Sequence, residues 1–140
     1  MGLDTYAGRT PVDFFDPDLD ETTVGEHFGC TWRDRLALWL AEKRRERDGG
    51  CIFSGNYFRG KLYSDLILFV TGVYLYQVWI PPETVKEMAE AFERREAKQA
   101  IDGLGESGHQ LYDHHPSEFE DLRAFFQVCA KRGLGLVGSW

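Results

Sequence analysis

The densest apolar run of the chain lies within residues 51–83, and this stretch most constrains the fold. The run from Leu66 to Ile80 is only 15 residues long and includes Thr71, Gly72 and Gln77. A helix that crosses a membrane needs about 20 consecutive apolar residues. The run is therefore predicted to belong to a buried core, and no membrane partner is expected.

The length and composition favour one folded unit. With 140 residues, of which 43% are hydrophobic, the chain can build its own core, and we expect a single globular domain over residues 1–140. The formal net charge of −7 argues against nonspecific binding to nucleic acid or to an anionic membrane. An acidic inhibitor that mimics nucleic acid stays open, because such a protein opposes basic surfaces.

Charge is unevenly distributed along the chain. Residues 1–30 carry seven acidic side chains and one arginine, a net charge of −6. Residues 31–61 carry eight basic and four acidic side chains, a net charge of +4. These two regions either lie against each other or present opposite charges to a partner.

The cysteines bear on the cellular setting. Cys30, Cys51 and Cys129 are odd in number and widely spaced. In a chain with a core of this size, that pattern argues against a disulfide framework and for a reduced environment. The first residues show no basic stretch followed by an apolar one, so no signal peptide is expected. The predicted localisation is cytoplasmic.

The first third of the chain contains a short strand and an acidic loop. Polar and apolar residues alternate over 3–7, which predicts an N-terminal strand. Residues 9–26 are rich in Pro and Asp and are predicted to form an acidic loop. Asp16-Pro-Asp18-Leu-Asp20 begins like a calcium loop, but Glu21 and His27 stand where such a loop needs Gly and Glu. A solvated turn is therefore favoured over calcium binding.

A helix is expected over residues 31–48. Thr31 is suited to cap it, with Asp34 as the partner in an imperfect capping box, and Gly49-Gly50 ends it. Its large apolar side chains share one side of the helix, which we predict to face inward. They are Trp32, Leu36, Trp39 and Leu40.

Residues 62–80 have two interpretations. Either a helix ends at Gly72 and an extended segment follows, or a hairpin turns at Thr71-Gly72; the helix is favoured. Further helices are predicted over 82–100 and from Ser117 onward, the latter with a capping box closed by Glu120.

The overall prediction is an α+β fold, with three or four helices packed on a small antiparallel sheet. The sheet is expected to form from the two ends of the chain and the segment around Cys51. Residues 134–137 supply the closing strand, which we expect to pair with the N-terminal strand.

One motif suggests an anion-binding loop. Gly55-Asn56-Tyr57-Phe58-Arg59-Gly60-Lys61 has the spacing of a phosphate-binding loop, but Leu62 replaces the Ser or Thr whose hydroxyl holds magnesium. A nucleoside triphosphatase is therefore disfavoured. A looser role remains as a hypothesis, in which the loop contacts a nucleotide-like or phosphorylated ligand. Its residues would be Asn56, Tyr57, Arg59, Gly60 and Lys61.

A cluster of histidines suggests metal chemistry. His109, His114 and His115 lie close in sequence, and His27 with Cys30 would supply half of a zinc site. No second half with standard spacing follows, so the preferred interpretation is a polar turn ahead of a helix. No cofactor is expected.

Nucleophilic catalysis and the binding of a planar ligand are both disfavoured. Cys51 or Ser54 would need a histidine and an acidic partner to act as a nucleophile. Ser54 has Ile52 where a nucleophile elbow needs Gly, and Cys51 lies in an apolar strand, where a thiol is usually inert. The aromatic side chains of this region either line a pocket for a planar ligand or, as we favour, belong to the core. They are Tyr57, Phe58, Tyr63, Tyr74, Tyr76 and Trp79.

Three stretches of the chain carry a resemblance. They are the opening Met-Gly-Leu-Asp-Thr-Tyr-Ala, the middle Phe58-Arg-Gly-Lys-Leu-Tyr63 with Trp79-Ile-Pro-Pro-Glu-Thr-Val85, and the closing Cys129-Ala-Lys-Arg-Gly-Leu-Gly-Leu-Val137. Together they resemble a family of small uncharacterised proteins of bacteria and their phages. The resemblance implies no activity or site residue. It leaves residues 31–48 unmatched, which suggests an inserted helix, and its phage association suggests a regulator that acts by binding.

Three functions follow as hypotheses. The first is a non-enzymatic module, associated with a phage or mobile element, that recognises a protein partner through a helical or acidic surface. Such a module should expose an apolar patch. The second is a binder of a small anionic ligand, and the third is a metal-dependent hydrolase. A homo-oligomer stays open.

Overall fold

The computed structural model describes residues 2–11, 27–47 and 50–140. Over these residues the chain forms five helices and one five-stranded antiparallel sheet, so the predicted α+β class is confirmed. The predicted number of three or four helices is wrong, since the described part of the chain contains five. The calcium-like pattern and most of the predicted acidic loop lie outside the described residues.

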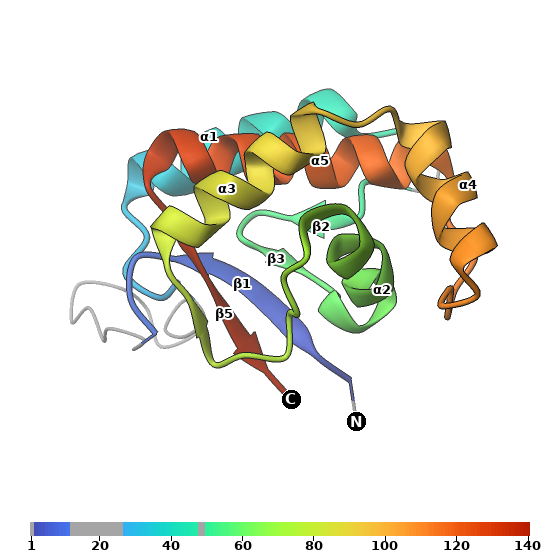
Figure 1. The fold of residues 1–140 in the computed structure, drawn as a ribbon. Coiled ribbons are helices and arrows are strands. Elements are labelled where there is room, and N and C mark those ends of the chain that lie inside the picture. The colour runs from blue at the N-terminus through green and yellow to red at the C-terminus, as the bar shows by residue number, and fades with distance from the viewer. Residues whose placement is uncertain (1, 12–26, 48–49) are drawn as a thin grey trace.

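The sheet joins the two ends of the chain. Its strand order is β2-β3-β1-β5-β4, and each neighbouring pair is antiparallel. β1 and β5 pair at its centre with Thr5 opposite Gly138, which confirms the expected pairing of the terminal strands. Both termini consequently lie at the same end of the sheet (Figure 1). The strands are β1 (Asp4–Gly8), β2 (Phe53–Ser54), β3 (Tyr57–Phe58), β4 (Trp79–Ile80) and β5 (Gly135–Ser139).

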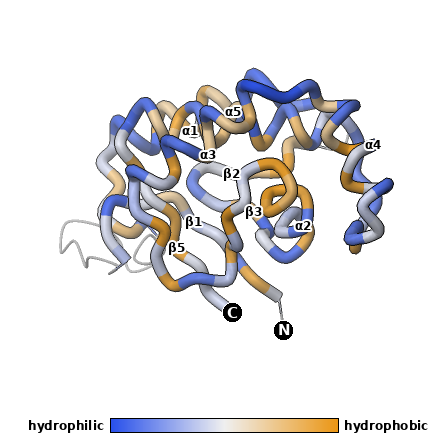
Figure 2. The backbone as a smooth tube through the Cα atoms, in the orientation of Figure 1, coloured by the Kyte–Doolittle hydropathy of each residue, from blue (hydrophilic) through white to orange (hydrophobic). Residues whose placement is uncertain are grey.

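α1, α3 and α5 lie together over this sheet, with α5 in contact with both α1 and α3, and α2 and α4 lie to one side (Figure 1). α2 packs against α3 and α4. It is the most apolar of the described helices (Figure 2). The helices are α1 (Trp32–Arg45), α2 (Gly60–Thr71), α3 (Pro82–Glu93), α4 (Ala97–Ser107) and α5 (Pro116–Arg132).

Aromatic rings of α5 connect the layers. Phe125 packs edge-on against Phe53 of β2 and Phe58 of β3, with ring centroids 5.3 and 5.1 Å apart. Its neighbour Phe126 stacks on Phe92 of α3 at 5.1 Å. All five rings are at most 1% exposed. α5 therefore forms the centre of the core, between the sheet and the other helices.

The ambiguous segment 62–80 is a helix followed by an extended stretch. α2 ends at Gly72, which has the left-handed conformation (φ 75°) and donates its N–H to the carbonyl of Leu68. β4 follows as an edge strand beside β5. The favoured interpretation is confirmed, and the hairpin alternative is wrong.

The helix predicted over residues 82–100 is two helices instead. α3 ends at Glu93, and α4 begins at Ala97. The break is stabilised from α5, because the guanidinium of Arg123 donates to the carbonyls of Phe92 and Arg95 at the end of α3. Gly103 lies inside α4 and does not end it. A Cβ at Gly103 would lie 3.0 Å from the ring of Phe69, so glycine lets α4 approach α2 closely.

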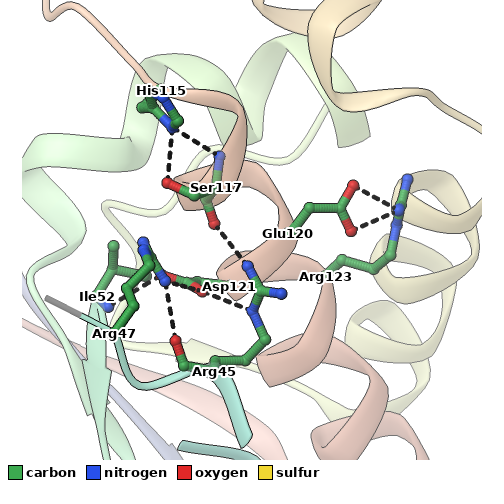
Figure 3. A network of polar contacts seen from close by, with 8 residues as sticks. All are labelled: Arg45, Arg47, Ile52, His115, Ser117, Glu120, Asp121 and Arg123. Carbon is green, nitrogen blue, oxygen red and sulfur yellow. Dashed lines mark hydrogen bonds and ion pairs between the residues drawn. The ribbon is translucent and has the colours of Figure 1, made fainter. Parts of the chain in front are cut away.

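The last helix begins earlier than predicted. Its N-cap is His115, and its capping box closes with Glu118 rather than with Glu120. The imidazole of His115 accepts the N–H of Ser117 at 3.1 Å, and Pro116 occupies the first turn, where its missing N–H costs nothing. Glu120 instead holds Arg123, at 2.7 and 2.8 Å (Figure 3).

Gly60→Ala is expected to destabilise the protein, because α2 starts where it touches β1. A Cβ at Gly60 would lie 2.2 Å from Oγ1 of the buried Thr5 and 2.9 Å from the side chain of Leu3. We expect a loss of about 1–3 kcal/mol in the free energy of unfolding, measured by urea titration. Gly105→Ala is the control, since that Cβ would meet only the amide end of Gln110, at 3.1 Å. Equal effects of the two substitutions would contradict the packing role of Gly60.

Candidate functional site

The outer side of α1 exposes four large apolar side chains. Trp32 is 62% exposed, Leu36 45%, Trp39 50% and Leu40 39%. The prediction that these residues face inward is therefore wrong. The side that packs on the body of the protein buries Asp34, Leu38 and Ala41 instead. We call the exposed set Trp32, Leu36, Trp39 and Leu40 the outer α1 face.

A buried carboxylate fixes the beginning of α1. Asp34 is 0% exposed and accepts two hydrogen bonds from Arg9, at 2.7 and 2.8 Å, and one from Arg132, at 2.9 Å. It also accepts the N–H of Thr31, while the Thr31 hydroxyl accepts the N–H of Asp34, so the predicted capping box is confirmed. Burial alone would raise the pKa of Asp34, but these hydrogen bonds outweigh it and lower the pKa to about 2.

A second buried carboxylate fixes the end of α1 (Figure 3). Asp121 of α5 is 0% exposed and accepts a hydrogen bond from Arg45 at 2.8 Å. Arg47 binds the same carboxylate through both of its terminal nitrogens, at 2.9 and 2.8 Å. The backbone N–H of Ile52 contributes a further bond at 3.3 Å. Both ends of α1 are thus attached to α5 by charge-assisted hydrogen bonds.

These two anchors explain the orientation of α1. Asp34 and Arg45 lie on the same side of the helix as the buried Leu38, so binding their partners turns that side inward and the two tryptophans outward. Cationic groups cover part of the outer α1 face. Arg33 lies 5.3 Å from the ring of Trp32, and Lys43 lies 5.8 Å from the ring of Trp39.

The predicted anion-binding loop is a hairpin that leads into α2. Asn56 is engaged in the sheet, since its amide donates to the carbonyl of Ala7 at 3.1 Å. The hydroxyl of Tyr57 donates to Asp4 at 2.9 Å. Gly60 packs against β1, as described above. Two side chains of the predicted set, Arg59 and Lys61, flank the start of α2. The ligand role of this set remains a prediction.

The three predicted histidines lie in different surroundings. His109 is exposed, and His115 caps α5. The side chain of His114 is 1% exposed and lies between two carboxylates, with Nε2 2.9 Å from Asp65 and Nδ1 3.7 Å from Glu118. In the described part of the chain, no three His, Cys, Asp or Glu side chains are grouped so that they could hold a metal ion. His27 and Cys30 are likewise not joined to this cluster there.

The side chain of His114 is almost inaccessible from outside the protein. A histidine between carboxylates can relay a proton, but a side chain that is 1% exposed offers a substrate no approach. Tyr63 packs against the imidazole, with centroids 5.8 Å apart. Burial and the nearby charge of Glu118 raise the pKa of Tyr63 to about 12, which keeps its hydroxyl protonated.

The thiols are also in environments that suppress reactivity. Burial raises the pKa of Cys30 to about 11 and also raises the pKa of Cys51. Cys129 is fully buried, and its pKa lies well above the ordinary value for the same reason. All three are free thiols in the structure. A thiol with a raised pKa forms little of the reactive thiolate at neutral pH.

Comparisons with known proteins give no match to this chain: no protein-family model, no curated protein and no solved structure is significantly similar. The resemblance to small bacterial and phage proteins therefore remains an expectation from the sequence. Among the described helices, none is long and apolar enough to cross a membrane.

The apolar row of α1 is visible in the sequence, but it lies on the outer side of the helix and not on the inner side as predicted. The signal that could have corrected it is the spacing of Asp34, Leu38, Ala41 and Arg45, which places two charged residues on the opposite side together with two small or medium apolar ones. A buried charge requires distant partners, and here these are Arg9, Arg132 and Asp121. Sequence spacing alone does not reveal such partners.

The anchor at Asp34 predicts a pH dependence. Its pKa in the folded protein, about 2, lies below the ordinary value of 3.8, so its contribution to stability is complete above about pH 4 and is lost as the pH falls toward 2. We expect the wild type to lose about 2 kcal/mol more than Asp34→Asn between pH 5 and pH 2, measured by urea unfolding. The other carboxylates titrate in both proteins, so the difference isolates Asp34. Parallel pH curves for the two proteins would rule out this role.

Proposed function

We propose that this chain is a non-enzymatic binding module that recognises a protein partner through the outer α1 face. The observation that carries the proposal is the exposure of Trp32, Leu36, Trp39 and Leu40 on a helix that is held at both ends by buried ion pairs. The resemblance to small bacterial and phage proteins agrees with a regulator that acts by binding.

The energetics of the outer α1 face support a covering partner. Burying a large apolar side chain stabilises a protein by about 1.5–3 kcal/mol, and four such side chains on α1 remain in water. Single exposed apolar residues are ordinary, whereas a row along one side of a helix marks an interaction surface. Tryptophan is also enriched among the residues that dominate binding energy in protein interfaces.

The chemistry of the partner follows from the same surface. A helix that presents residues at spacings of three and four fits an apolar groove, as in complexes that bind an amphipathic helix. The basic side chains Arg33, Lys43 and Arg44 border this row. The matching groove on the partner is therefore expected to have an acidic rim, which would steer association and fix its orientation.

An enzymatic function receives less support from the described residues. The thiols have raised pKa values, and the side chain of His114 is only 1% exposed. The metal-dependent hydrolase would need ligands that the described part of the chain does not group together. Binding by α1 requires none of these groups, and the surface that it needs is already exposed.

If the outer α1 face binds a protein partner, substitutions in that face should abolish capture of the partner. The experiment compares protein captured from host cells by the wild type with protein captured by Leu36→Glu/Trp39→Glu, using quantitative mass spectrometry. Both residues are about half exposed, so the variant is expected to stay folded, and a circular-dichroism melt checks this. We expect at least a tenfold loss of one stoichiometric partner, because charges would be buried in its apolar groove.

The matched control is Val78→Glu, which introduces a charge at another exposed apolar residue (64%) outside α1. This variant is expected to retain the partner. Sedimentation of the purified proteins shows whether the partner is a second copy of the chain, since a homo-oligomer would dissociate in the α1 variant alone. Capture of the same proteins by all three baits would refute the proposed role of α1.

A further inference from the structure

A hollow whose lining includes no residue of α1 has the form of a small-molecule site. It lies between α2, α4, the extended segment after α2 and the chain that leads into α5, and its volume is about 630 Å³. Pockets that hold small ligands typically measure about 300–1,000 Å³. Its aromatic walls are Phe69, Tyr74, Tyr76 and Tyr112. We propose that this pocket binds a small planar aromatic anion, a function that does not depend on the outer α1 face.

The aromatic wall is prearranged to receive a flat ring. Tyr74 and Tyr76 stack on each other with centroids 5.3 Å apart and an angle of 28° between their planes. Trp140 packs edge-on against Tyr76 at 5.7 Å, which fixes that ring from the side of the C-terminus. Tyr74 itself is 53% exposed, so one ring borders the opening. Offset stacking on such rings favours a planar aromatic ligand over an aliphatic one.

The two charged residues in the lining of the pocket, Lys61 and Asp65, carry opposite charges and differ in how far these are already engaged. The side chain of Asp65 is 3% exposed and its oxygens are engaged within the protein. One oxygen accepts from His114 at 2.9 Å, and the other accepts the N–H of Leu111, also at 2.9 Å. No described residue forms an ion pair with Lys61. Its ammonium group is therefore available to a ligand, and an anion is the charge that it selects.

Two more polar groups complete the lining. Ser64, one turn before Leu68 on α2, faces the pocket, and His109 borders it from the chain after α4. A mainly apolar cavity with a few convergent polar groups is the usual form of a specific small-molecule site. The predicted anion-binding loop and this pocket share Lys61, whereas Asn56 and Tyr57 are engaged in the sheet. A ligand of Lys61 would therefore lie in the pocket beside α2 and not within the hairpin.

The test uses two fluorescent probes that share the same rings and differ by one sulfonate group. Anilinonaphthalene sulfonate carries planar rings and a sulfonate, and anilinonaphthalene has the same rings without the charge. Each probe is titrated into the intact protein, and its dissociation constant and stoichiometry are taken from the fluorescence. We expect the sulfonate to bind at one site per chain and about tenfold more tightly than the neutral probe, as a charge-assisted contact to Lys61 requires.

Three variants assign the binding to this pocket. Lys61→Met is expected to weaken the sulfonate about tenfold and to leave the neutral probe unchanged. Tyr74→Ala should weaken both probes, because each stacks on the same ring, and its exposure makes misfolding improbable as a cause. Lys98→Met, an exposed lysine of α4 outside the lining, should change neither. Thermal melts confirm that each variant is folded.

The opposite results would overturn the inference. It fails if Lys61→Met and Lys98→Met affect the sulfonate equally, because the attraction would then come from the general surface charge. It also fails if Tyr74→Ala leaves both probes unchanged while Trp39→Ala abolishes their binding, because the probes would then lie on the outer α1 face. Loss of partner capture by the α1 variant is a separate measurement, so the two proposals can fail independently.

Discussion

The buried ion pairs at Asp34 and Asp121 determine how the helical layer is arranged. Each carboxylate is 0% exposed and is shared by two arginines from distant parts of the chain. Ion pairs of buried groups add little net stability, because desolvation offsets the attraction. Here the carboxylates are buried and their arginines are 33–38% exposed, so removing an arginine leaves a buried carboxylate short of hydrogen bonds. Their effect is therefore to exclude other orientations of α1. An apolar interface between α1 and α5 alone would not fix which side of the helix faces out.

The protein presents two surfaces with different chemistry. At one side, the outer α1 face presents tryptophan and leucine on a rigid helix. Elsewhere, the turn after α2 brings Tyr74 and Tyr76 beside α4 and leaves the hollow that Lys61 borders. The first surface suits a groove on a macromolecule and the second a small planar anion. Neither uses the buried histidine, whose carboxylate partners keep it inside the protein.

Local signals were sufficient for much of the fold. The alternation over 3–7, the Thr31 cap and the stop at Gly72 depend on neighbouring residues, and each predicted element is present. The predictions that were wrong depend on contacts between residues that are far apart in the sequence. The break after α3 depends on Arg123, about 30 positions away, and the side of α1 that faces inward depends on Arg132 and Asp121. The pocket could not be predicted, since four separate segments form it.

Amide hydrogen exchange of α1 and α5 tests most directly whether the anchored helix is a fixed part of the fold. We expect the amides of the buried side of α1, around Leu38 and Ala41, to exchange as slowly as those of α5, by global unfolding. In Asp121→Asn, the same α1 amides should exchange before those of α5, because one anchor is weakened. Rapid local exchange of α1 in the wild type, with α5 still protected, would contradict a rigidly held α1 and the binding surface that depends on it.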